Sequence, residues 1–117
     1  MNLALGIDTS NYTTSLALYD AQAHELCQVK RLLPVKEGEK GLRQSDAVFH
    51  HVQQLPKLMD KLWKPGCGKA LSAVGVSARP RDVEGSYMPC FLSGKSAAYA
   101  AAMTAGVPVF EFSHQAG

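Results

Sequence analysis

The sequence has no apolar run near the roughly 20 residues that a bilayer-spanning helix requires. It also lacks a basic opening segment followed by a short apolar stretch and a small-residue cleavage site. These absences argue against a membrane span and a secretory leader. We therefore expect a cytoplasmic protein with no membrane partner.

Cysteine is scarce as well. Cys27, Cys67 and Cys90 are an odd number, at spacings that fit neither a zinc site nor a disulfide framework. The net charge of +2 is too small to predict strong nucleic-acid binding or attraction to a membrane surface. With 117 residues, 46% of them hydrophobic, the chain suits one domain with a modest core.

The stretch from Leu3 to Asp20 reads as a strand, a polar turn and a second strand. Asp8 ends the first strand, and the turn residues Thr9, Ser10, Asn11 and Thr13 offer hydroxyl groups and backbone N–H groups. Two interpretations fit. The turn is either an ordinary surface hairpin or a phosphate-binding loop. In the second case Asp8 holds a metal ion or a water molecule beside the phosphate.

The next segments are also predicted from their patterns. A third strand covers Glu25 to Leu33, and the charged stretch from Val35 to Arg43 is a loop. Its cations Lys36, Lys40 and Arg43 are either simply solvated or directed at a phosphate or tRNA.

A long helix is predicted from an N-cap at Ser45 to about Trp63. Its expected buried face is Val48, Phe49, Val52, Leu55, Met59, Leu62 and Trp63. Pro56 should bend this helix. His50 and His51 diverge by about 100° and cannot share one ligand. Structural packing or exposure is the favoured account of each.

A buried strand over Ala70 to Ser77 follows, reached through the helix and therefore parallel in the same sheet. The polar loop after it carries Arg79 and Arg81, which either hold a phosphate or pair with Asp82 and Glu84.

A second helix capped by Ser86 is dense in small residues between Ser93 and Ala105 and stops at Gly106. Such residues let a helix approach a sheet or another helix closely. Val107 to Phe112 is the last predicted strand.

The predicted order is β-β-β-α-β-α-β, an antiparallel meander followed by parallel strands. This order resembles the ribonuclease H-like half-domain, of which the actin-like ATPase superfamily (sugar kinases, Hsp70 and actin) uses two with nucleotide between them.

Three motifs extend the resemblance to one family. Gly6-Ile7-Asp8-Thr9-Ser10 matches its GI(D/E)TS turn. The segment from His50 to Leu58 matches HHxxxLPxL, and the segment from His114 to Gly117 matches the start of HxxGH. The sequence thus resembles the tRNA threonylcarbamoyladenosine transferases, long catalogued as glycoproteases or O-sialoglycoprotein endopeptidases.

The resemblance implies a metal- and ATP-dependent transferase that acts on tRNA. His114 matches the first histidine ligand of a divalent ion (Zn, Fe or Mg), which engages ATP or threonylcarbamoyl-adenylate in that family. The second histidine would follow Gly117. The sequence is therefore expected to be the N-terminal subdomain of a two-subdomain protein and inactive alone.

Two departures from the family pattern make a divergent paralogue the expected parent protein. Asn11, Tyr12 and Thr13 are neutral where the family carries Cys-Asp-Glu after its acidic-Thr-Ser triplet. Arg79-Pro80-Arg81 replaces a Gly-Pro-Gly loop. The two arginines supply positive charge, but their side chains block the close backbone approach to a phosphate that glycines allow.

Two alternatives to the transferase remain. One is a non-catalytic paralogue that scaffolds a partner, or a homodimer, through the helix from Ser93 to Ala105. The other is a metallopeptidase, which is disfavoured because His114-Gln115 lacks the glutamate general base of HExxH.

Overall fold

The computed structural model describes residues 2–10, 12–34, 44–64, 67–79 and 89–113. These residues form five strands and three helices in the predicted order, with one addition, a single-turn helix before the fourth strand. The elements are β1 (Leu3–Asp8), β2 (Thr13–Asp20), β3 (Glu25–Leu32), α1 (Gln44–Leu62), α2 (Cys67–Ala70), β4 (Leu71–Arg79), α3 (Phe91–Ala105) and β5 (Val109–Ser113).

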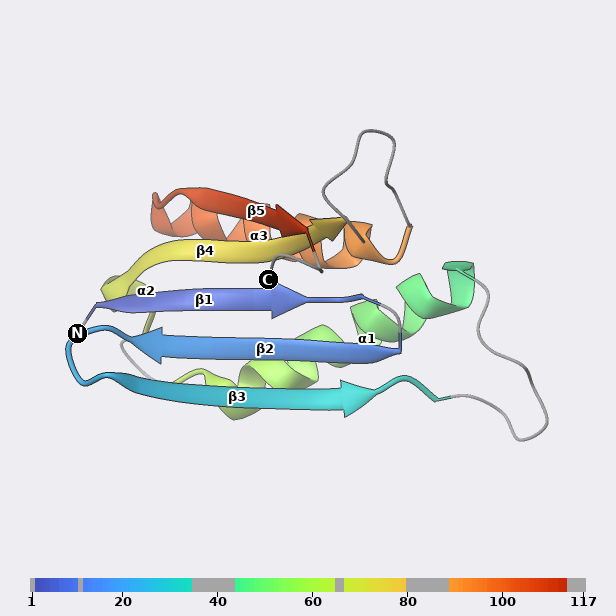
Figure 1. The fold of residues 1–117 in the computed structure, drawn as a ribbon, viewed down its shortest axis with the longest axis horizontal. Coiled ribbons are helices and arrows are strands. Elements are labelled where there is room, and N and C mark those ends of the chain that lie inside the picture. The colour runs from blue at the N-terminus through green and yellow to red at the C-terminus, as the bar shows by residue number, and fades with distance from the viewer. Residues whose placement is uncertain (1, 11, 35–43, 65–66, 80–88, 114–117) are drawn as a thin grey trace.

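The strands form one mixed sheet in the order β3-β2-β1-β4-β5, so the first strand of the chain lies in the middle (Figure 1). β1 is antiparallel to β2, and β2 is antiparallel to β3. β1 is parallel to β4, and β4 is parallel to β5. The predicted fold class, an antiparallel meander followed by parallel strands reached through helices, is confirmed.

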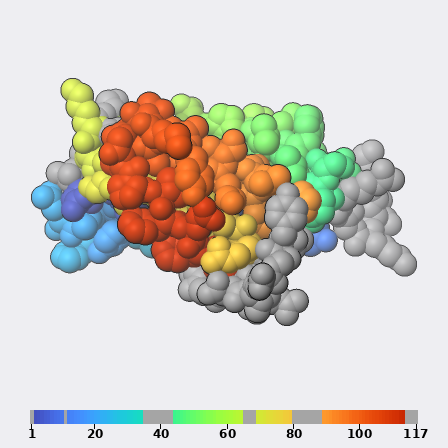
Figure 2. All heavy atoms as spheres, turned by 90° about the horizontal axis from the view of Figure 1, so that it is seen from above, coloured from blue at the N-terminus to red at the C-terminus, as the bar shows by residue number. Residues whose placement is uncertain are grey.

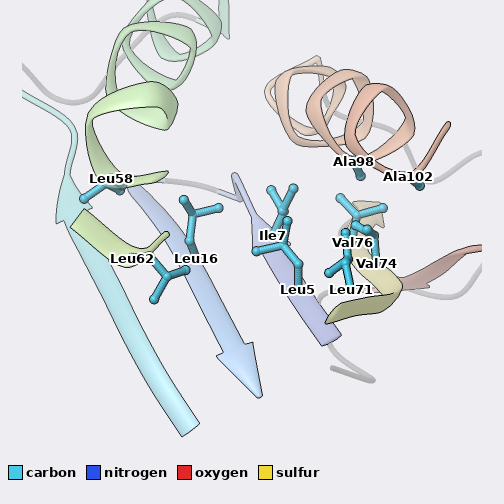
Figure 3. Close-up of a cluster of buried hydrophobic side chains, with 10 residues drawn as sticks. All are labelled: Leu5, Ile7, Leu16, Leu58, Leu62, Leu71, Val74, Val76, Ala98 and Ala102. Atoms are coloured by element: carbon cyan, nitrogen blue, oxygen red, sulfur yellow. The ribbon is translucent and has the colours of Figure 1, made fainter. Parts of the chain in front are cut away.

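Helices α1 and α3 cover the same face of the sheet (Figures 1 and 2). Alternation along the strands turns Leu5, Ile7, Leu16, Val74 and Val76 toward these helices (Figure 3). Leu58 and Leu62 of α1 and Ala98 and Ala102 of α3 complete the core from above. Among the described helices, none is both long and apolar enough to cross a membrane.

The predicted face of α1 is only partly right. The buried positions are Ala47, His51, Gln54, Leu58 and Leu62, whereas Phe49 and Val52 are 57% and 53% exposed. The prediction used hydrophobicity alone. The buried stripe also includes two polar residues, His51 and Gln54, which hydrogen-bond to Thr14. The helix also begins at Gln44, so Ser45 lies within it and not at its cap. Pro56 is inside the helix as expected.

The small residues of α3 face the sheet. Ser93, Gly94, Ala98 and Ala102 are buried, and a side chain at Gly94 would collide with β1 and the turn after it. The helix ends as predicted at Gly106, which adopts a left-handed φ of 72°. The N–H of Val107 donates to the carbonyl of Ala102 at 2.9 Å, which completes a Schellman motif and delays the start of β5 to Val109.

A polar contact ties α3 to β5. The Tyr99 hydroxyl donates to the Glu111 carboxylate, and Lys95 Nζ lies 3.6 Å from it. The hydrogen bond from Tyr99 lowers the pKa of Glu111, burial opposes that shift, and the charge of Lys95 adds to the lowering.

Replacing Tyr99 by phenylalanine is therefore expected to raise the pKa of Glu111, as followed by carboxyl-carbon NMR during a pH titration. Because the folded-state pKa is lowered, this contact stabilises the protein above the unfolded-state carboxyl pKa and ceases to do so as pH falls through the folded-state pKa. Lys95→Gln, which removes a smaller cause, should raise the pKa less. An unchanged Glu111 titration in Tyr99→Phe would contradict the assignment.

Candidate functional site

The candidate site was predicted at the carboxyl end of β1. Asp8 is the last residue of that strand, and its Oδ1 accepts the N–H of Ser10 at 2.8 Å. The N–H of Thr13 reaches the Ser10 carbonyl at 3.4 Å. The carboxylate thus organises the first part of the turn as an Asx turn, and Asp8 is itself partly exposed.

Thr9 connects this turn to α3. Its hydroxyl donates to the Cys90 carbonyl at 2.9 Å and accepts the Gly94 N–H at 3.1 Å. It therefore bridges a carbonyl and an amide four residues apart in the first turn of the helix. Ser93 Oγ donates to the same carbonyl at 2.7 Å. Thr9 is fully buried, so its hydroxyl serves this junction, and only its backbone could serve the predicted role in phosphate binding.

A hollow of about 290 Å³ lies on the sheet face opposite the helices. Its floor is made of small residues, Gly6, Ala17 and Gly75, and Phe112 stands at one side. Its polar lining comes from Asp8, Ser15, Gln28 and Ser77. The Gln28 amide donates to Ser15 Oγ at 3.2 Å. Asp8 thus belongs both to the turn and to the polar end of this hollow.

A second polar cluster is buried between β2 and α1. Gln54 Nε2 donates to the Leu32 carbonyl at 3.1 Å, which turns Gln54 Oε1 toward Thr14. The Thr14 hydroxyl donates to that oxygen at 2.8 Å, so it accepts a hydrogen bond from His51 Nδ1–H at 2.7 Å. This chain of hydrogen bonds fixes the protonated nitrogen of His51 and ties α1 to β2 and β3. The structural interpretation of His51 is confirmed, and His50 packs against the Phe49 ring at a centroid distance of 5.5 Å.

The structure brings some predicted site residues together and separates others. Asp8, Thr9, Ser10 and Thr13 lie at one turn, with Ser10 buried. Arg79 ends β4, and its charge is one of the smaller causes that lower the pKa of Glu111. Arg79 does not line the hollow beside Asp8.

Other predicted residues lie outside the described part of the chain. These are Asn11, Arg81 and His114, together with the loop cations Lys36, Lys40 and Arg43. Within the described residues, no group of three or more His, Cys, Asp or Glu side chains is placed to hold a metal ion. Asp8 alone is therefore an incomplete metal site, and the predicted metal site stays a prediction.

Sequence reasoning missed Ser15, Gln28 and Ser77 as neighbours of Asp8. Strand alternation contained the signal, because Asp8 pairs with Ser15 and Ser77 lies two residues beyond Gly75, the partner of Gly6. The Thr14–His51–Gln54 chain carried no such signal. Thr14 precedes His51 and Gln54 by 37 and 40 residues, and these two are polar residues on a helix face that was predicted from hydrophobicity.

The mixed sheet with two helices on one face is the ribonuclease H-like fold. Two similar solved structures are YeaZ from Pseudomonas aeruginosa (TM-score 0.64, 16% identity) and an uncharacterized protein from that organism with similarity to peptidase YeaZ (TM-score 0.69, 17% identity). Each comparison covers 97% of this chain and 44% of the other, so this chain spans less than half of their length.

A third similar structure is RuvC from T. thermophilus in complex with a Holliday junction substrate. Its TM-score is 0.50 and its identity 14%, over 98% of this chain and 66% of that one. No family model and no curated protein sequence matches this chain. At identities of 14–17%, the likeness to these structures establishes the fold.

Proposed function

We propose that this chain is the N-terminal part of a threonylcarbamoyl transferase-like protein of the glycoprotease family that takes part in tRNA modification. The observation that carries the proposal is the position of Asp8. It ends the central strand, organises a Thr/Ser turn through its carboxylate, and faces a hollow at the sheet surface. The YeaZ fold and the matched sequence motifs support the same assignment.

The described residues fit a nucleotide-dependent role in part. A carboxylate at a strand end beside backbone N–H groups suits a metal ion or a water molecule that contacts phosphate. We propose that His114 and donors from a second half of the parent protein complete the coordination of this ion. When bound, such an ion would polarise the donor that carries the threonylcarbamoyl group. Asp8 would orient it, and the 117-residue chain alone would be inactive.

A scaffolding paralogue is the second candidate function, and Thr9 favours it. In this chain the Thr9 hydroxyl is fully used in holding α3, and Asn11 to Thr13 bring no carboxylate to the turn. Such a protein would bind a related protein through the outer face of α3. The small residues face inward, so the available contacts are Leu92, Tyr99 and Met103, which are exposed.

Transfer of labelled threonylcarbamoyl to unmodified tRNA tests the proposal. The longer protein that contains this chain would be supplied with a donor-forming enzyme. We expect transfer, and we expect Asp8→Asn to lower it about 100-fold, because the amide cannot orient a cation as the carboxylate does.

Asp20→Asn is the matched control, since Asp20 ends β2 at the opposite end of the strands from Asp8 and caps a turn that an amide can also cap. Equal activity of Asp8→Asn and the unmodified protein would refute the assignment of Asp8. Absence of transfer together with capture of a related protein would favour the scaffold.

A further inference from the structure

A second hollow, of about 550 Å³, lies next to the hollow beside Asp8. Its lining includes Thr13, Lys30, Arg31 and Leu32. Ser15 lines the first hollow and pairs with Lys30, so the two hollows are neighbours on the sheet. Lys30 and Arg31 are both exposed. The second hollow is therefore cationic, whereas the first combines small, aromatic and polar residues.

The first hollow suits a flat aromatic ring. Its floor includes Gly6 and Gly75, which pair across β1 and β4, so no side chain rises from that part of the floor. Phe112 forms one side, is 47% exposed, and places Cε2 3.4 Å from the position of a Cβ on Gly75. A ligand ring can therefore lie on the glycine backbone and stack against the phenylalanine. Proteins hold the bases of single strands by such stacking.

Polar groups at the edge of the first hollow match the edge of a nucleobase. The Gln28 amide and the hydroxyl groups of Ser15 and Ser77 line it together. Because Ser15 Oγ accepts a hydrogen bond from the Gln28 amide at 3.2 Å, the Ser15 hydroxyl keeps its own proton to donate. Hydroxyl groups and an amide offer both the donors and the acceptors that a base edge requires. The first hollow therefore favours a nucleobase over a plain aromatic ring.

We infer that the two hollows form a site for one nucleotide, with the base in the first hollow and the phosphate at Lys30. Asp8, Ser15 and Lys30 lie in one row across β1, β2 and β3. Asp8 and Lys30 are thus two strand spacings apart, about 10 Å. The Asp8 carboxylate repels a phosphate and the Lys30 ammonium attracts it, which fixes the direction of the nucleotide. Arg31 adds positive charge to the second hollow.

This inference goes beyond the proposed function, because nucleotide binding would be a property of the 117-residue chain itself. The nucleotide can belong to an unpaired RNA strand or be free, and both sources offer the same base and phosphate. A strand would use one further residue. Phe110 is 52% exposed and lies two residues before Phe112, hence on the same face, where the next base can stack.

NMR titration of the 117-residue chain with AMP, adenosine and a short single-stranded RNA tests the inference. Binding should be weak because the net charge is only +2, and the amide signals of Gly6 and Gly75 should shift. AMP should bind more tightly than adenosine at low salt, and Lys30→Gln should abolish that difference. Phe112→Leu, which keeps an apolar side chain without a flat ring, should weaken AMP binding about tenfold, whereas Phe112→Trp should retain it.

The RNA arm identifies the source of the nucleotide. RNA that binds more tightly than AMP, and that loses this advantage in Phe110→Leu, supports the site and identifies an RNA strand as the ligand. AMP that binds as tightly as RNA supports the site and identifies a free nucleotide.

Phe49→Leu and Lys61→Gln are the matched controls, because they make the same changes on α1, on the other side of the sheet. Neither should alter AMP binding. The absence of AMP binding, or equal binding by Phe112→Leu and the unmodified chain, would overturn the inference. If the longer protein still transferred threonylcarbamoyl, that result would refute this site alone. AMP binding without transfer would support the site and refute only the proposed function.

Discussion

Thr14→Val is expected to lower the free energy of unfolding by about 3 kcal/mol, although valine has nearly the same shape as threonine. Thr14 is fully buried, and its hydroxyl connects His51 Nδ1 with Gln54 Oε1. Valine would leave His51 and Gln54 without their hydrogen bonds to this hydroxyl, and these two residues are themselves only 0% and 7% exposed. Each buried group left without its partner costs about 1–3 kcal/mol. Urea denaturation followed by circular dichroism measures the change.

Thr14→Ser separates the hydroxyl from the methyl group. Serine keeps the oxygen and should recover most of the loss, leaving about 1 kcal/mol for the missing methyl group. Thr13→Val, one residue earlier and on the other face of β2, should change stability by less than about 0.5 kcal/mol. If Thr14→Val and Thr14→Ser were equally destabilised, the hydrogen-bond chain would not be the cause.

The second large effect is expected at Gly94, where alanine should destabilise the protein by about 2 kcal/mol. In most helices this change is favourable by about 1 kcal/mol. Here a Cβ would stand 2.8 Å from Thr9 Oγ1 and 3.3 Å from Thr9 Cγ2. Thr9 is short, β-branched and held by two hydrogen bonds, so it cannot move aside without breaking the junction with α3.

Gly6→Ala is the control, since its Cβ meets nothing closer than 3.8 Å and should be tolerated within about 0.5 kcal/mol. Thermal and urea denaturation of Gly94→Ala, Thr9→Ala and the double variant would give the coupling between the two sites. The double variant should lose less stability than the sum of the single ones, because removing Thr9 relieves the collision. Strict additivity would show that Gly94 is required for another reason.

The order of elements and the mixed sheet could be predicted from the sequence because strand alternation, turn residues and the Gly106 stop are local signals. Boundaries were less accurate where tertiary contacts decide them. Val107 was predicted in the last strand, but its N–H completes the cap of α3. On α1, hydrophobic spacing selected Phe49 and Val52, while the buried positions include His51 and Gln54. A polar residue's burial depends on a partner that sequence spacing does not reveal.

The candidate site, too, was predictable where local signals determine it and not where tertiary contacts do. The motif placed Asp8 and its turn correctly at a strand end, since local hydrogen bonds of Asp, Ser and Thr are predictable from type and position. The burial of Thr9 under α3 was not predictable, because its partners Cys90 and Gly94 are more than eighty residues away. Ser15 and Ser77 required the strand register, which three parallel and antiparallel pairings together determine.

The central position of β1 has a consequence for how the chain acquires its structure during synthesis. β1, β2 and β3 are contiguous and can pair as soon as they are made, whereas Ile7 pairs with Val76, about 70 residues later. Until β4 arrives, one edge of β1 has open backbone donors and acceptors and the apolar side chains of the meander have no complete cover. The nascent chain therefore passes through a stage in which one strand edge is unpaired and open to intermolecular pairing. Slow synthesis of the segment up to β4 should favour aggregation over folding.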